Sequence, residues 1–144
     1  MDLFQEPRNL FIALMLLCPA VAVVNSLVFG SKLKRFARRI RMFSSQDDIV
    51  RFQRVVAQQM YAALTQIVLL SVPAVLYVLG VVRGFLGVAD LVFVIVPSLV
   101  VLAFGIAMKK VEQQVRRIPT RDEDLARQRD AVVTTWMRKP FPDW

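Results

Sequence analysis

Three long stretches without a charged residue constrain this chain more than any other feature. They cover residues 9–31, 55–82 and 91–108. A helix rises ~1.5 Å per residue, so roughly 17 to 25 residues cross a hydrocarbon layer of ~30 Å. Each stretch has about that length, and an α-helix in lipid satisfies its own backbone hydrogen bonds. The sequence therefore predicts an all-α integral membrane protein with three transmembrane helices.

The composition shows the same separation of apolar and charged residues. Hydrophobic residues make up 56% of the 144 residues, yet 19 Lys and Arg against 11 Asp and Glu leave a net charge of +8. The chain has no His and a single Cys, Cys18. These counts exclude a zinc cluster, a haem-ligating His, a cysteine-ligated iron–sulfur centre and a Cys–His dyad. We therefore expect a protein that is not an enzyme and that has no cofactor and no metal site.

The distribution of basic residues predicts the orientation in the membrane. One Lys or Arg precedes the first stretch, eight lie between the first and second, one lies between the second and third, and nine follow the third. Basic loops stay in the cytoplasm, so the N-terminus and the turn at residues 83–90 should face outward in a bacterial cytoplasmic membrane. Asp2 and Glu6 make the leader unlike the basic start of a signal peptide. The first stretch is therefore interpreted as a retained span.

The chain then divides into four parts. Residues 1–31 form an external N-terminus and the first transmembrane helix, and residues 32–56 form a basic amphipathic loop with a helix extension. Residues 57–108 form a transmembrane helical hairpin that continues into the cytoplasm. Residues 109–144 form a cytoplasmic tail with an amphipathic helix and an extended end.

Two sequence signals predict where the cytoplasmic helices begin. Ser44 is followed by acidic residues, which is typical of a Ser N-cap with acids at the positive end of the helix dipole. This helix should run unbroken into the second transmembrane stretch. Pro119 should end the third helix, and Thr120 with Glu123 matches the T-x-x-E capping box that opens another.

A basic amphipathic segment lies between Lys32 and Phe43. Its apolar residues recur at helical spacing, and basic residues fill most of the other positions. Juxtamembrane Lys and Arg contribute ~1 kcal/mol each near an anionic leaflet, so one interpretation is contact with anionic lipid headgroups. The alternative is that these cations only enforce the topology while their long side chains extend to the interface. Nucleic acid is not expected as a partner, because the charge is held at the bilayer. The predicted headgroup contacts are Lys32, Lys34, Arg35, Arg38, Arg39 and Arg41.

The second transmembrane stretch carries one polar face. Gln59, Gln66, Pro73 and Tyr77 lie within about 40° of one another on a helical projection. Polar and small side chains at such a face mediate helix–helix contacts in membranes. The face is therefore interpreted as packing within the chain, as a seam for another subunit, or as the lining of a pore or of a site for a hydrophobic ligand such as a quinone.

The C-terminal tail combines an amphipathic helix with the segment KPFPDW, whose prolines favour an extended form. Exposed aromatic side chains normally seek burial. Trp136, Phe141 and Trp144 are therefore predicted to dock into a partner or back onto the chain's own helices. The alternative is an end that only touches lipid headgroups.

The arrangement of spans resembles two known groups of membrane proteins. An outside N-terminus, a basic cytoplasmic loop and a hairpin extended into the cytoplasm are similar to motor-stator proteins of the ExbB and MotA type and to insertases of the YidC type. The resemblance covers the three spans, the loop here is far shorter than in the stators, and no Arg lies inside a span as in the insertases. It adds no assignment, because fold analogy does not transfer function.

The expected function is contact rather than chemistry. We expect an accessory or scaffolding subunit of a larger bacterial membrane complex, with other membrane subunits and anionic lipids as partners. The alternatives are a homo-oligomeric pore or motor-like ring, and an insertase or lipid-handling protein.

Overall fold

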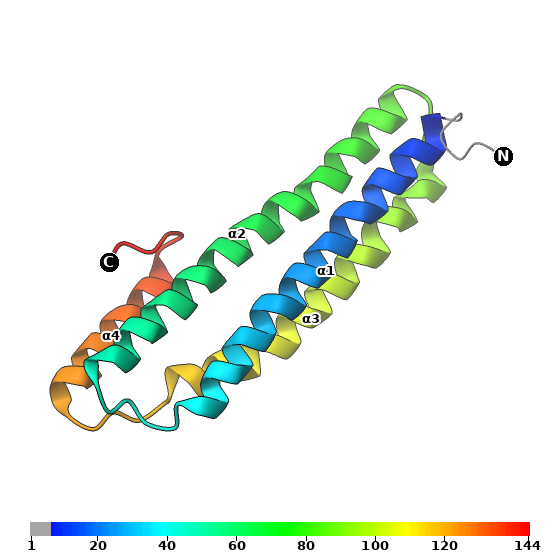
Figure 1. Cartoon of the computed structure of the whole chain (residues 1–144). Coiled ribbons are helices and arrows are strands. Elements are labelled where there is room, and N and C mark those ends of the chain that lie inside the picture. The colour runs from blue at the N-terminus through cyan, green and yellow to red at the C-terminus, as the bar shows by residue number, and fades with distance from the viewer. Residues whose placement is uncertain (1–6) are drawn as a thin grey trace. The chain divides into compact units, whose positions relative to one another are not determined.

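The computed structural model describes residues 7–144, and almost all of them are helical (Figure 1). Asp2 and Glu6, which support the retained-span interpretation, lie outside the described residues. The fold is all-α, as predicted, with four α-helices and one short 3-10 helix. These elements are α1 (Pro7–Arg39), α2 (Gln46–Val82), η1 (Val88–Leu91), α3 (Val92–Arg116) and α4 (Glu123–Arg138).

Among the described residues, three helical segments are long and apolar enough to cross a membrane, which agrees with the three predicted spans. They are α1, α2 and the segment Val88–Arg116, which joins η1 to α3. Each contains one proline, at Pro19, Pro73 and Pro97, and membrane helices tolerate such residues. The 37 residues of α2 form a single helix, so the chain does pass unbroken from its acidic first turn into the second span.

Helices α1, α2 and α3 each contribute to two packing units. The first, here called the apolar unit, comprises Met1–Ser26 and Thr65–Gly105. The second, here called the basic unit, comprises Leu27–Leu64 and Ile106–Trp144. Eight of the basic residues that precede the second span and all nine that follow the third belong to the basic unit.

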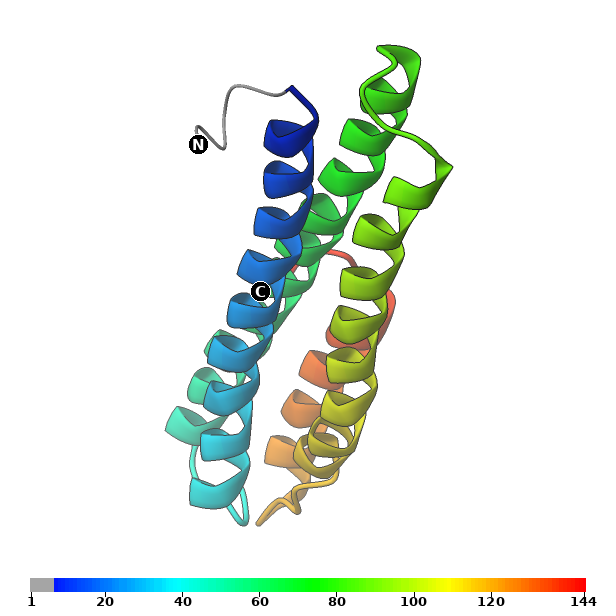
Figure 2. The same ribbon diagram turned by 90° about the vertical axis from the view of Figure 1, so that its right-hand side faces the viewer.

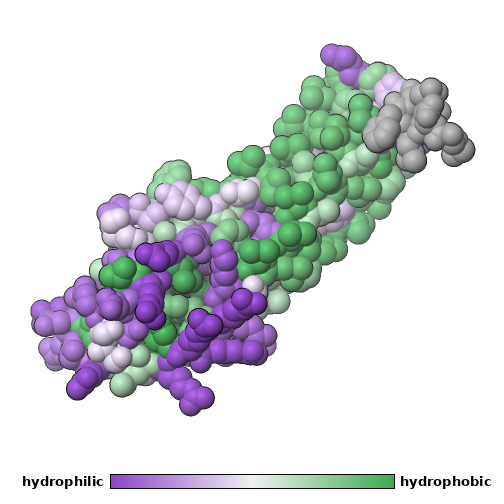
Figure 3. Space-filling view, in the orientation of Figure 1, coloured by the Kyte–Doolittle hydropathy of each residue, from purple (hydrophilic) through white to green (hydrophobic). Residues whose placement is uncertain are grey.

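The apolar unit buries few large side chains. Its buried hydrophobic residues are Met15, Ala22, Leu86 and Val101. Most of its Leu, Val and Ile side chains point outward, and they give it the hydrophobic surface coloured green in Figure 3. Such a surface is stable only in an apolar environment, because exposing it to water is unfavourable.

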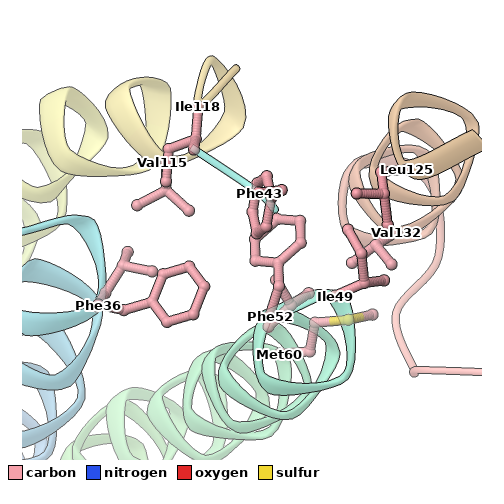
Figure 4. Packing of buried hydrophobic residues seen from close by; sticks show 11 residues of the cluster. Phe36, Phe43, Ile49, Phe52, Met60, Val115, Ile118, Leu125 and Val132 are labelled. Carbon is pink, nitrogen blue, oxygen red and sulfur yellow. The ribbon is translucent and has the colours of Figure 1, made fainter. Parts of the chain in front are cut away.

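The basic unit instead has a dense hydrophobic core. Figure 4 shows side chains from α1, α2, α3, α4 and their connections pointing toward a common centre. The rings of Phe36, Phe43 and Phe52 contact one another, with centroids 5.4 to 6.3 Å apart. The whole buried cluster is Leu33, Phe36, Phe43, Ile49, Phe52, Val56, Met60, Val115, Ile118, Leu125 and Val132.

A short parallel bridge joins two connections of the basic unit, which Figure 2 shows at the same end of the helices. The backbone N–H of Phe43, between α1 and α2, donates to Pro119 O at 2.9 Å. The N–H of Arg121, between α3 and α4, donates to Phe43 O at 2.9 Å. The bridge therefore places the Phe43 ring in the core and ties two segments that are far apart in sequence.

The capping box predicted for α4 was wrong, whereas α2 begins as predicted, directly after two serines and with Asp47 and Asp48 in its first turn. The N-cap of α4 is Asp122, whose carboxylate accepts from Leu125 N–H at 2.9 Å, instead of Thr120. Thr120 lies in the bridge with Phe43, the N–H of the next residue, Arg121, donates to Phe43 O, and α4 begins only at Glu123. At the start of α2, Asp48 reaches back and accepts from Ser44 N–H at 3.1 Å. A charged acceptor forms stronger hydrogen bonds than a hydroxyl, and at the start of each helix a carboxylate, Asp48 or Asp122, accepts from nearby backbone N–H groups.

Candidate functional site

The basic segment that follows the first span is part of α1. The helix continues to Arg39 and ends there, short of the predicted limit at Phe43. Its apolar residues Leu33 and Phe36 are buried in the core of the basic unit. In the helical part of the segment, residues 32–39, the exposed side chains are therefore the basic ones.

The six basic residues predicted to contact headgroups are all exposed. Among the described residues none of the six forms an ion pair. Lys32 is the most constrained, because its Nζ lies 4.8 Å from the centre of the Phe29 ring. Figure 3 shows hydrophilic side chains gathered over this part of the basic unit. A group of unpaired cations produces a positive potential that attracts anionic groups.

Helices α1 and α3 approach each other closely near the first lysines. A Cβ added at Gly30 would lie 2.9 Å from Sδ of Met108, so only glycine fits there without a shift. The two helices run in the same direction (Figure 2), and Lys32 and Lys110 each follow two residues later. The charge-free stretches of α1 and α3 therefore end at one common level.

The polar face of α2 is divided between the two units. In the basic unit, Gln59 Nε2 donates to Phe29 O of α1 at 2.6 Å. In the apolar unit, Gln66 Nε2 donates to Ser26 Oγ of α1 at 3.0 Å. The side-chain amide of each Gln therefore donates a hydrogen bond from α2 to α1.

The other two members of the predicted polar face also lie within the apolar unit. Pro73 is buried, and the Tyr77 hydroxyl donates to Gly87 O at 3.3 Å. A separate groove of about 280 Å³ runs along α2 and involves none of these residues. Its lining is Ile67, Val68, Ser71, Val72, Val75 and Leu76.

An ion pair at the α2–α3 turn was missed by the sequence analysis. Arg8 donates to Asp90 Oδ1 at 2.7 Å, and Gly87 N–H donates to Asp90 Oδ2 at 2.8 Å. Asp90 is nearly inaccessible to solvent, while Arg8 is half-exposed. The sequence does contain a sign of this ion pair: Arg8 directly precedes one charge-free stretch, and Asp90, of opposite charge, directly precedes another. The pair fastens the start of α1 to the turn between the other two spans.

The three predicted docking residues of the tail have different environments. Trp136 packs into the basic unit, with its ring 6.5 Å from that of Phe52 and the Arg116 guanidinium 4.8 Å above it. Phe141 and Trp144 remain 56% and 45% exposed. The structure therefore separates Trp136, which is packed, from the two aromatic residues of the extended end.

The extended end turns back over α4 (Figure 1). Lys139 pairs with Asp143, and the Thr135 hydroxyl donates to the same carboxylate at 3.4 Å. The Lys139 ammonium holds the pKa of Asp143 below its usual range. Trp144 and Asp143 line a hollow of about 270 Å³ together with Gln53 of α2. The other lining residues are Gln128, Ala131, Val132 and Thr135 of α4.

The three long apolar helices indicate a small, all-α, multi-pass membrane protein. Within residues 7–144, no three Asp, Glu or Cys side chains come together as a set that could hold a metal ion. Comparisons with protein-family models, curated proteins and solved structures find no match to this chain.

Proposed function

We propose that this protein is a non-enzymatic accessory or scaffolding subunit of a larger complex in a bacterial cytoplasmic membrane. The observation that carries the proposal is that the side-chain amides of Gln59 and Gln66 donate hydrogen bonds to α1 of the same chain. The outer faces of the spans are left apolar. Such faces contact partner helices by close packing, which is a main source of helix association in lipid.

The same hydrogen bonds disfavour the polar face as a pore lining. A pore built on Gln59 and Gln66 would turn their amides toward water and remove donors from α1. Tyr77 is likewise occupied by the α2–α3 turn. Lateral packing needs no such change, so it fits the geometry with the least rearrangement.

The proposed orientation has the N-terminus outside and the tail in the cytoplasm. It is supported by the packing of the loop at residues 32–54 and the tail at residues 109–144 in one unit. Segments that share a core lie on one side of a membrane, and these two carry 17 of the 19 basic residues. The positive-inside rule assigns that side to the cytoplasm.

Purification from native membranes in mild detergent, followed by native mass measurement, tests the proposed function. We expect the chain to co-purify with different membrane subunits in a defined stoichiometry. A stable ring of identical chains would contradict the proposal and favour the pore or motor-like alternative. Crosslinks to nascent chains from the Gln59 and Gln66 face would instead favour the insertase alternative.

Site-specific labelling tests the proposed orientation. Cys18→Ser removes the single cysteine, and a new cysteine is then placed at Val88, which is 85% exposed in the α2–α3 turn, or at the exposed Ser45. A membrane-impermeant maleimide should label V88C in intact cells and S45C only after lysis. Labelling of S45C in intact cells would overturn the orientation.

A further inference from the structure

We propose that the extended C-terminal segment, residues 139–144, is an anchor at the bilayer surface, with Phe141 and Trp144 inserted among the lipid headgroups beside α2. The proposal goes beyond the scaffolding function, because it assigns this segment a lipid surface as its partner. It rests on the level at which the segment sits along α2, on its exposed side chains and on the contacts that hold it in place.

The position of the C-terminal segment along α2 follows from the hollow that Trp144 and Asp143 line together with Gln53. Gln53 lies two residues before the charge-free stretch 55–82. At ~1.5 Å per residue these 28 residues extend ~42 Å, which matches the roughly 40–45 Å of a bilayer with its headgroup layers. Residues 53–82 extend ~45 Å, so Gln53, and with it the end of the chain, falls at the outer side of the headgroup layer.

The contacts between helices give the same level independently. Gln59 bonds to Phe29 O, and Lys32 follows three residues later on the antiparallel helix α1. The matching position on α2 is three residues before Gln59, at Val56, and Gln53 is one further turn away, or ~4.5 Å. A headgroup layer is about 5–7 Å thick on each side of the hydrocarbon. The segment therefore lies within the layer that the first lysines mark.

The exposed side chains of the segment suit this layer. Phe141 and Trp144 are half-exposed, and the preceding Met137 is 57% exposed. Arg138 and Lys139 are also exposed beside them. Trp combines an apolar ring with an N–H donor and is enriched at membrane–water interfaces, while the cations attract lipid phosphates. The combination fits a membrane surface better than it fits water.

Internal contacts close the segment on itself. Lys139 and Thr135 both bond to the Asp143 carboxylate, so the chain is closed across residues 135–143. Pro140 and Pro142 restrict the backbone between them. These restraints reduce the conformational freedom that the segment has to lose when it enters the headgroup layer.

The two tryptophans of the chain allow a direct test in vesicles of phosphatidylcholine and phosphatidylglycerol. Trp136→Phe leaves Trp144 as the sole reporter, and Trp144→Phe leaves Trp136, which packs between Phe52 and Arg116, as the matched control. The full-length variants are reconstituted with lipid brominated either near the headgroup end or near the end of the acyl chain. The measurement is the fluorescence that each bromine position quenches.

We expect headgroup-end bromine to remove about half of the Trp144 emission, because interfacial Trp sits at that depth. Chain-end bromine should remove much less, and Trp136 should change little with either lipid. If Trp136→Phe disturbs the core, subtracting the Trp144→Phe signal from that of the native chain isolates Trp144 without altering Trp136. Equal quenching of the two tryptophans, or no quenching of Trp144 in lipid alone, would overturn the proposal. Protection of Trp144 only in the purified native complex would assign the segment to a protein partner instead.

Discussion

The two packing units of this protein bury opposite kinds of side chain. The apolar unit encloses Asp90 and the Gln66–Ser26 hydrogen bond, while its Leu, Val and Ile residues point outward. The basic unit encloses the rings of Phe36, Phe43 and Phe52, while Lys and Arg cover its surface. One chain therefore follows two burial rules.

The difference teaches which force holds each unit together. Water drives apolar side chains into a core, and this force acts on the basic unit. In lipid the surroundings are as apolar as the side chains, so close packing and hydrogen bonds take over in the apolar unit. Substitutions of the same kind should therefore have different effects in the two units.

The largest expected effect is from Phe52→Ala in the basic unit. Phe52 is fully buried and contacts three other aromatic rings. Removing a buried Phe side chain costs ~3–5 kcal/mol, so the free energy of unfolding in detergent, followed by Trp136 fluorescence, should fall by that amount. Val82→Ala, at a 76% exposed position of the apolar unit, is the control and should have almost no effect. Equal losses of unfolding free energy in the two variants would contradict the difference between the basic and the apolar unit.

The next effect is expected from Gly80→Ala in the apolar unit. A Cβ at Gly80 would lie 2.4 Å from Cδ1 and 2.7 Å from Cγ of the buried Leu86. Overpacking of this kind costs about 1–3 kcal/mol, which thermal unfolding in detergent would measure. Gly105→Ala, where nothing lies within 4 Å of the added Cβ, is the matched control and should be neutral or stabilising. A neutral Gly80→Ala would show that the turn side of this unit is loosely packed.

A smaller effect is expected from the hydrogen bond between Gln66 and Ser26. Double-mutant cycles on such bonds in membrane proteins average ~0.6 kcal/mol. Gln66→Leu and Ser26→Ala, measured singly and together, should give a coupling energy of that size. Zero coupling would indicate that the amide has another partner, and would remove one support for packing between α1 and α2.

The smallest effect is the acid sensitivity of the C-terminal segment. Because its pKa is lowered, Asp143 stabilises the closed segment above the usual carboxyl pKa of ~3.9, and this stabilisation is lost as the pH falls through the lowered value. In the Trp136→Phe variant, the fluorescence of Trp144 should therefore change only between the usual carboxyl pKa and the lowered pKa of Asp143 or below it. Adding Asp143→Asn should abolish the change, and a transition near neutral pH would contradict the assignment to Asp143.

The sequence was sufficient for features that depend on one segment at a time. Three charge-free stretches predicted three long helices, and the acids at residues 47 and 48 marked the start of α2. The amphipathic stripe also predicted α4. Each signal is local, because a helix forms from its own periodicity, length and first turn.

Features that depend on a meeting of distant segments were not predicted. Thr120 matches a capping box, but it lies opposite Phe43 in a bridge whose hydrogen bonds use Pro119 O and Arg121 N–H. Trp136 was predicted to dock into a partner or back onto the chain's own helices, but its particular neighbours, Phe52 and Arg116, follow only when α2 and α3 meet its ring. Arg8 and Asp90 are 82 positions apart. A local sequence pattern does not show which distant residue such a side chain will contact.

The bridge between Phe43 and Thr120 also sets an order of events during synthesis. The connection between α1 and α2 leaves the ribosome long before residues 119–121, which supply its backbone partners. Until then the Phe43 ring lacks Ile118, Leu125 and Val132 to pack against. A chain that ended before residue 118 would leave the Phe43 ring without these neighbours. The core of the basic unit can therefore close only after α4 has been synthesised.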